Sequence, residues 1–292
     1  MKIGLGTAQF GLDYGISNPD GKTNMEEAVR ILNTAARYGI RVIDTASLYG
    51  NSEEVLGGLM SPGQKFDIVT KTPVFKKDSI SEADARVLQD IFSRSLKSIG
   101  KTSLYGLMVH NCNDLLAKNG KLIMETMEGL KERGLVKKIG VSVYTGWQID
   151  QLLEKYAIDI IQVPINVLDQ RLLTGGHLYR LKNAGVEIHA RSVFLQGLLL
   201  LDPDKLHPFF DGIRLHLKNY HRLIRTQGHT PVGAALGFVT GIREVDVVLC
   251  GINNQFQLEE ICRLAEVPLD SKDFSEFAIE DEYILNPSLW QI

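Results

Sequence analysis

The sequence has little cysteine and no long apolar run. Its three cysteines, Cys112, Cys250 and Cys262, are odd in number and widely spaced, which suits neither a disulfide framework nor a Cys-x-x-Cys metal site. No segment reaches the roughly 18 apolar residues that a membrane span requires. The glycine-rich start, residues 1–7, lacks the apolar core of a secretory signal. These absences predict a cytoplasmic protein with no metal centre and no membrane partner.

The chain also lacks an excess of charge of either sign. Lysine and arginine number 32 against 35 aspartate and glutamate residues, a formal net charge of −3, which gives no electrostatic reason to expect a nucleic acid as partner. Hydrophobic residues make up 44% of the chain, enough for a sizeable core. No Pro- or Ser-rich linker divides the sequence, so we expect a single domain over residues 1–292 and leave its oligomeric state open.

Short β-branched runs alternate with longer amphipathic stretches along the whole chain, a pattern typical of a parallel sheet with crossover helices. The predicted strands lie at residues 3–6, 41–44, 67–71, 104–109, 138–142, 159–163, 186–191 and 246–250. Because eight strand–helix units close a TIM barrel, the predicted fold class is α/β, a single (β/α)8 barrel. Two segments lie outside that count. They are residues 198–229, predicted as a long loop after the seventh strand, and the tail, residues 270–292.

Helix ends carry sequence signals between the predicted strands. Asn24 predicts the start of a helix and Gly39 its end, and Ser81 and Gly100 enclose another. The last full helix is expected over about 255–265.

A polar residue closes almost every predicted strand. In chain order, the closing residues are Thr7, Asp44, Lys71, His110, Ser142, Gln162, Arg191 and Gly251. The carboxyl ends of barrel strands converge on one rim, where barrel enzymes build their sites. Each residue alone could be a turn or a solvated strand end. Taken together, they lead us to expect Asp44, Lys71 and His110 to meet in space, beside Tyr49 from the loop that follows Asp44.

These side chains form a coherent acid–base set. A phenol with a pKa of about 10 is a poor acid at neutral pH, but a nearby ammonium stabilises its anion and lowers that pKa. A carboxylate can hold the lysine in place and charged. Asp44, Tyr49, Lys71 and His110 therefore make a candidate proton-donating site that requires no metal.

At these residues the sequence resembles the aldo-keto reductase family, and the resemblance covers essentially the whole chain. Residues 44–57, DTASLYGNSEEVLG, are similar to the long signature of the family, and residues 4–7 to its first strand. Lys71 and His110 match its third and fourth strand ends, and residues 139–142 its fifth strand. The resemblance implies an NAD(P)H-dependent oxidoreductase that reduces an aldehyde, ketone or sugar-like carbonyl of a small-molecule substrate.

The resemblance also implies roles for these residues. Tyr49 would be the general acid, Lys71 would lower its pKa, Asp44 would hold Lys71, and His110 would orient the carbonyl oxygen. The implied cofactor-binding residues are Gly6, Thr7, Asp44, Ser142, Gln162, Arg191, Ser192, Gln196, Gly197, Gly251, Asn253, Gln257 and Glu260.

Four positions depart from the pattern of the family. Val143 replaces the asparagine that commonly follows Ser142, and Arg191 stands where many members have an aromatic ring that stacks on the nicotinamide. Gly251 stands where some members have lysine, and Gln257 where many have arginine. In the family, those basic residues bind the 2′-phosphate of NADP(H). Because this chain lacks them at both positions, either NADP(H) or NAD(H) is expected as the cofactor.

Two other functions are consistent with parts of this pattern. A regulatory module could keep the cofactor site with little turnover, although an intact Asp-Tyr-Lys-His set disfavours it. A barrel enzyme that uses Lys71 as a Schiff-base nucleophile would leave Tyr49 and residues 249–260 unexplained.

Overall fold

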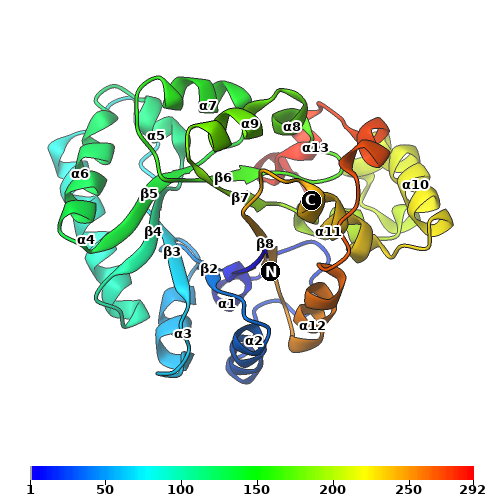
Figure 1. Cartoon of the computed structure of the whole chain (residues 1–292), viewed down its shortest axis with the longest axis horizontal. Coiled ribbons are helices and arrows are strands. Elements are labelled where there is room, and N and C mark those ends of the chain that lie inside the picture. Colours follow the sequence, from blue (N-terminus) through cyan, green and yellow to red (C-terminus); the bar gives the residue numbers. More distant parts are fainter. Residues whose placement is uncertain (1) are drawn as a thin grey trace.

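The computed structural model describes residues 2–292, and its centre is a closed barrel of eight parallel strands (Figure 1). The strands are β1 (Ile3–Gly6), β2 (Val42–Asp44), β3 (Asp67–Lys71), β4 (Leu104–Val109), β5 (Val136–Ser142), β6 (Ile160–Pro164), β7 (Glu187–Arg191) and β8 (Val247–Gly251). Each strand pairs with the next one, and β8 closes the ring on β1 with Ile3 opposite Val248. The predicted (β/α)8 fold is confirmed, and every strand lies within two residues of its predicted bounds.

The helices surround this barrel (Figure 1). They are α1 (Ala8–Gly11), α2 (Met25–Arg37), α3 (Ser52–Leu59), α4 (Glu82–Ile99), α5 (Cys112–Leu116), α6 (Lys121–Glu132), α7 (Gly146–Leu153), α8 (Arg171–Thr174), α9 (His177–Asn183), α10 (Asp211–Thr226), α11 (Pro231–Gly241), α12 (Gln255–Leu264) and α13 (Glu282–Leu285). The predicted helix ends are confirmed: Asn24 caps α2, Ser81 caps α4 with Asp84 in a capping box, and Gly100 ends α4 in the left-handed conformation.

Apolar side chains fill both the layer between helices and strands and the inside of the barrel. The outer layer is one continuous cluster, which includes Leu32 of α2 and Phe92 of α4. A separate small cluster of Val69, Met108 and Ile160 fills the barrel centre. The barrel is therefore a packed core rather than a pore, and only its ends are free to build a site.

The segment after β7 that was predicted as a long loop contains a 16-residue helix, α10. Figure 1 shows α10, in yellow, at the periphery of the molecule. Its buried residues Ile213, Leu217, Tyr220 and Ile224 recur at helical spacing, so this segment packs one apolar face and folds as a helix rather than as a loop.

The tail beyond α12 packs against the barrel through short turns and α13. Phe274 and Phe277 are buried in the core. The ring of Trp290 meets that of Phe210, just before α10, edge to face with centroids 5.0 Å apart, and its indole N–H donates to the carbonyl of Ile284. The tail and the α10 segment therefore support each other.

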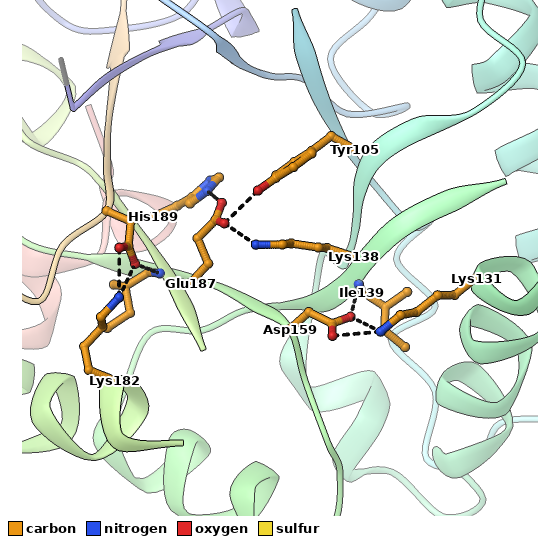
Figure 2. Close-up of polar contacts among 10 residues, drawn as sticks. Tyr105, Lys131, Lys138, Ile139, Asp159, Lys182, Glu187 and His189 are labelled. Carbon is orange, nitrogen blue, oxygen red and sulfur yellow. Dashed lines mark hydrogen bonds and ion pairs between the residues drawn. The ribbon is translucent and has the colours of Figure 1, made fainter. Parts of the chain in front are cut away.

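A polar cluster lies at the amino ends of the strands (Figure 2). The carboxylate of Glu187, the first residue of β7, accepts hydrogen bonds from the Tyr105 hydroxyl at 2.7 Å and from the Lys138 ammonium, and pairs with His189 Nε2 at 2.7 Å. Figure 2 shows these three side chains converging on Glu187 from β4, β5 and β7. In barrel proteins this end contributes to stability, whereas the opposite rim carries the chemistry.

Candidate active site

A cavity of about 560 Å³ lies at the carboxyl ends of the strands. Every residue that the sequence placed in the site lines this cavity, except Lys71. The predicted residues that line it are Gly6, Thr7, Asp44, Tyr49, His110, Ser142, Gln162, Arg191, Ser192, Gln196, Gly197, Gly251, Asn253, Gln257 and Glu260. Lys71 lies behind this wall, with 1% of its side chain exposed.

Lys71 and Asp44 form a buried ion pair. The ammonium of Lys71 donates to both carboxylate oxygens of Asp44, at 2.7 and 2.6 Å, and to the carbonyl of Thr45 at 3.0 Å. Burial alone would lower the pKa of Lys71, but Asp44 and Tyr49 oppose it and the pKa lies above its ordinary value. Lys71 is therefore a fixed positive charge with its three protons engaged.

Gln162 is joined to the same carboxylate. Its side-chain nitrogen donates to Asp44 Oδ1 at 2.8 Å, the oxygen that also accepts from Lys71. Because a carboxylate can only accept hydrogen bonds, the amide group of Gln162 faces Asp44 through its nitrogen. Its oxygen remains as an acceptor for another partner.

Tyr49 lies beside this pair. The Lys71 ammonium is 5.0 Å from the centroid of the Tyr49 ring, and the ring of His110 meets that of Tyr49 edge to face at 5.9 Å. Burial raises the pKa of Tyr49, and Lys71 lowers it, as predicted from the sequence. Burial is the larger effect, so the pKa of Tyr49 lies above its ordinary value rather than below it. The expected lowering by Lys71 is thus present, but it is smaller than the effect of burial, whose depth residue types do not reveal.

His110 is held in its neutral form. Burial lowers its pKa to about 4, and the positive charges of Lys71 and Arg191 act in the same direction, against Asp44. At neutral pH the ring therefore carries one N–H group, and it is a hydrogen-bond donor rather than a charged acid.

Hydrogen bonds between hydroxyl groups hold the loop that carries Tyr49. Ser52 lies 2.9 Å from the carbonyl of Thr7, 2.8 Å from the Thr7 hydroxyl and 3.2 Å from the hydroxyl of Thr45. The loop also approaches α1 closely. A Cβ on Gly11 would lie 1.7 Å from the carbonyl oxygen of Tyr49, so only glycine permits this contact.

Two loops meet along another side of the cavity. The amide of Ile16, in the loop after α1, donates to the carbonyl of Gln196, in the segment after β7, at 3.0 Å. Gly197 has a φ of +97°, and a Cβ there would lie 1.9 Å from the hydroxyl oxygen of Ser17. The two loops thus form a continuous wall.

The wall segment after β7 is conformationally strained. Ser192, Leu195 and Gln196 all adopt positive φ angles, of 61°, 47° and 53°. Non-glycine residues adopt this left-handed conformation at a cost of about 1–2 kcal/mol each. Such strain is typical of segments that position backbone groups at functional sites.

The far end of the cavity carries no positive charge. Gln257 Oε1 accepts from the amide of Asn253 at 2.9 Å, and Glu260 also lines this end. Arg263, the basic residue next in sequence, donates to the carbonyl of Glu259 outside the cavity. Among the described residues that line the cavity, Arg191 is the one lysine or arginine.

Three buried polar atoms of residues that line the cavity have no hydrogen-bond partner among residues 2–292. They are Gln9 Oε1, His110 Nδ1 and Asn253 Oδ1. Buried polar groups are normally paired, so these atoms fit a site that a polar ligand completes. Together with Ser142 and the free oxygen of Gln162, they suit the amide and hydroxyl groups of a nicotinamide dinucleotide. Within the same described range, no cluster of three or more His, Cys, Asp or Glu residues could hold a metal.

Several residues that line the cavity were not predicted from the sequence. They include Gln9, Tyr14, Ser17, Asn18, Tyr144, Phe194, Pro287 and Ser288. Gln9 lies in α1, and Tyr14, Ser17 and Asn18 lie in the stretch 11–21, whose three glycines could have indicated a loop at the same rim. Pro287 and Ser288 belong to the tail 270–292, a trailing segment of the kind in which barrels carry substrate selectivity, but no single residue of this tail was predicted to line the cavity.

The chain is similar to known proteins over nearly its whole length. Residues 2–281 match the model of the Aldo/keto reductase family. The chain is 25% identical to aldo-keto reductase YhdN of Bacillus subtilis, over 93% of this chain and 87% of that protein. It is 30% identical to the oxidoreductase YtbE of the same organism, over 61% of this chain and 62% of that protein.

Solved structures share the fold. An aldo-keto reductase from Bacillus halodurans superposes with a TM-score of 0.75 at 19% identity, covering 97% of this chain and 95% of that one. A glycerol dehydrogenase from Gluconobacter oxydans gives a TM-score of 0.74, also at 19% identity, over 98% of this chain and 92% of that one. No helix within residues 2–292 is long and apolar enough to cross a membrane. With a family match that spans nearly all of its length, the chain belongs to the aldo/keto reductase family of oxidoreductases.

Proposed function

We propose that the protein is an NAD(P)H-dependent reductase of aldehydes, ketones or sugar-like carbonyls, with Tyr49 as the proton donor. The observation that supports this most directly is the buried Lys71–Asp44 ion pair beside the Tyr49 ring, at the wall of the cavity. This arrangement provides a proton donor on the cavity side and a fixed positive charge behind it.

The side chains divide the chemistry among them. A reduced nicotinamide cofactor, when bound, supplies the hydride that adds to the carbonyl carbon. The hydroxyl of Tyr49 gives its proton to the carbonyl oxygen, and neutral His110 donates a hydrogen bond to the same oxygen. The phenolate left on Tyr49 is stabilised by Lys71, which Asp44 keeps charged and in place. The lysine thus matters most after the proton has left, because only then does Tyr49 carry a negative charge.

The remaining cavity residues are proposed to hold the cofactor. Ser142 and the free oxygen of Gln162 suit the carboxamide, and the strained segment 192–197 suits the pyrophosphate. Asn253, Gln257 and Glu260 would hold the adenosine.

A Schiff-base role for Lys71 does not fit its surroundings. A nucleophilic amine must be neutral and accessible, whereas Lys71 is buried, has a raised pKa and donates to Asp44 and Thr45. No feature of the described residues specifically favours a regulatory module with little turnover. Measuring whether aldehydes oxidise bound NAD(P)H distinguishes this alternative.

The decisive experiment compares Tyr49→Phe with Tyr179→Phe, a matched change at an exposed tyrosine of α9. We expect Tyr49→Phe to lower kcat/KM for a panel of aldehydes by about 10²-fold or more, while the cofactor Kd stays within about twofold because the ring remains. Tyr179→Phe should match the unmodified protein. Near-normal turnover by Tyr49→Phe would remove Tyr49 from the mechanism. If no aldehyde oxidises NAD(P)H bound to the unmodified protein, the regulatory module would be the better proposal.

We also propose one domain over residues 1–292, working in the cytoplasm on a small-molecule carbonyl. The barrel, the α10 segment and the tail contribute to one continuous core. Cys112, Cys250 and Cys262 are free thiols, which suits a reducing compartment.

A further inference from the structure

Arg191 is a cation without an anionic partner at the mouth of the barrel. Its guanidinium donates to the carbonyl of Val143 at 3.1 Å and to the hydroxyl of Ser192 at 3.1 Å. The central carbon lies 4.2 Å from the centroid of the Tyr144 ring. Among residues 2–292, no carboxylate lies within ion-pair distance of it, whereas six other arginines have one.

The guanidinium is held in place before any ligand arrives. Two hydrogen bonds and one aromatic contact fix its plane, yet they use only two of its five N–H groups. Asp44, the carboxylate of the proposed mechanism, is already engaged by Lys71 and Gln162. The positive charge of Arg191 is therefore uncompensated and available to whatever occupies the cavity.

Arg191 lies beside the residues that suit the nicotinamide. In the sheet, Ser142 of β5 is opposite Gln162 of β6, and Pro164 at the end of β6 is opposite Arg191 of β7. The side chain of Val143 is fully buried in the core, so the contact of this residue with Arg191 is made by its backbone carbonyl. The guanidinium is thus anchored next to Ser142, at the edge where the carboxamide is proposed to bind.

We propose that Arg191 makes the site select the reduced cofactor over the oxidised one. The nicotinamide ring carries a positive charge when oxidised and none when reduced, so a fixed cation beside it repels only the oxidised form. In a partly exposed site, at the distances of neighbouring side chains, this repulsion should make the Kd of the oxidised cofactor larger than that of the reduced cofactor. The expected ratio is on the order of tenfold or more. The inference rests on the proposed function, because it assumes that nicotinamide binds at this rim.

Such a bias has a consequence for the direction of the reaction. A site that binds the reduced cofactor more tightly than the oxidised one releases the oxidised cofactor more readily after the reaction. This difference favours carbonyl reduction over alcohol oxidation. Arg191 would then be a positioning and selecting residue, since it transfers no proton or hydride itself.

The experiment measures the Kd of both redox forms by calorimetry, for NAD(H) and NADP(H), in the unmodified protein and in Arg191→Gln and Arg191→Lys. Glutamine keeps a planar hydrogen-bond donor but removes the charge, whereas lysine keeps the charge and loses the planar group. Arg263→Gln, an exposed arginine outside the cavity, serves as the matched control.

We expect the ratio of the oxidised to the reduced Kd to fall about tenfold in Arg191→Gln and to stay within about threefold in Arg191→Lys and Arg263→Gln. A ratio that Arg191→Gln leaves unchanged, or that Arg191→Lys lowers as strongly, would overturn the inference while leaving the proposed function intact. If the unmodified protein binds neither dinucleotide in either form, both proposals fail.

Discussion

Gln162 on β6 and Asp44 on β2 are joined across the mouth of the barrel by a hydrogen bond of 2.8 Å, although 118 positions separate them in the chain. The Asp44 oxygen in this bond also accepts from Lys71. One carboxylate thus connects the proton-donating half of the site with the strand proposed to hold the nicotinamide. Changes to this carboxylate or its partners should affect both stability and chemistry.

The first prediction concerns the ion pair itself. Lys71→Met should lower the free energy of unfolding by about 3–5 kcal/mol, because it leaves the buried charge of Asp44 without its counterion. Adding Asp44→Asn should recover at least about 1 kcal/mol, since the uncompensated charge is then gone. Both variants should be inactive in carbonyl reduction. Urea denaturation at pH 7 measures the stabilities, and a Lys71→Met protein as stable as the unmodified one would contradict this account of the pair.

The second prediction concerns pH. With a pKa of about 4, His110 stays neutral throughout the physiological range, and the raised pKa of Tyr49 keeps its proton in place. We therefore expect kcat/KM for an uncharged aldehyde to show no ionisation near 6.5, the ordinary pKa of histidine, and no loss of activity up to about pH 9. A pH profile with an apparent pKa between 6 and 7 that disappears in His110→Gln would show that His110 titrates during catalysis.

The third prediction concerns the 2′-phosphate of the cofactor. Because the far end of the cavity offers no lysine or arginine, the unmodified protein should bind NADPH and NADH with Kd values within about tenfold of each other. Gln257→Arg should shift the preference toward NADPH by about tenfold or more, since one charge-assisted hydrogen bond contributes about 1.5–3 kcal/mol.

Calorimetric titration of both cofactors tests this prediction. Gln227→Arg adds the same charge at the exposed end of α10 and should leave the preference unchanged. A hundredfold preference of the unmodified protein for NADPH would mean that a basic residue outside the described cavity wall reaches the phosphate.

The fourth prediction concerns acid stability and the opposite end of the barrel. Burial alone would raise the pKa of Glu187, but hydrogen bonds with His189, Lys138 and Tyr105 bring it down to about 2. A glutamate with an ordinary pKa of about 4.3 in the unfolded chain then contributes stability above pH 4.3, and this contribution is lost as the pH falls toward 2.

Glu187→Gln should lower the free energy of unfolding at pH 7 by roughly 1–3 kcal/mol and should make stability depend less on pH between about 4.5 and 2.5. The cofactor Kd should not change, because Glu187 lies at the far end of the barrel from the cavity. Glu54→Gln, at an exposed position of α3, is the control. Equal acid sensitivity of the Glu187→Gln and unmodified proteins would argue against this role for the cluster.

The fold and the main site residues were predictable because they depend on local pattern. Each strand is a short β-branched run, and parallel strands in a barrel must bring their carboxyl ends to one rim. This reasoning predicted that Asp44, Lys71 and His110 meet beside Tyr49. The structure brings the four together, with Lys71 behind the cavity wall that the other three line. The family resemblance supplied their proposed roles.

Other features depend on tertiary packing and could not be predicted in this way. The contact of Arg191 with the carbonyl of Val143 joins two positions that the sequence showed only as separate departures from the family. Whether the pKa of Tyr49 lies above or below its ordinary value depends on how the effect of burial compares with that of the Lys71 charge. Residue types alone do not give this balance. Residues 198–229 were predicted as a loop because Pro203 and Pro208 interrupt their start, whereas the apolar spacing of α10 forms one buried helix face.

The packing of Trp290 on Phe210 has a consequence for how such proteins diverge. The tail places Pro287 and Ser288 at the cavity, and the aromatic contact fixes the tail against the α10 segment. A mutation at position 210 can therefore move a cavity wall that Phe210 itself does not line. Divergence in what the cavity accepts can thus arise at Phe210 or Trp290, neither of which lines the cavity.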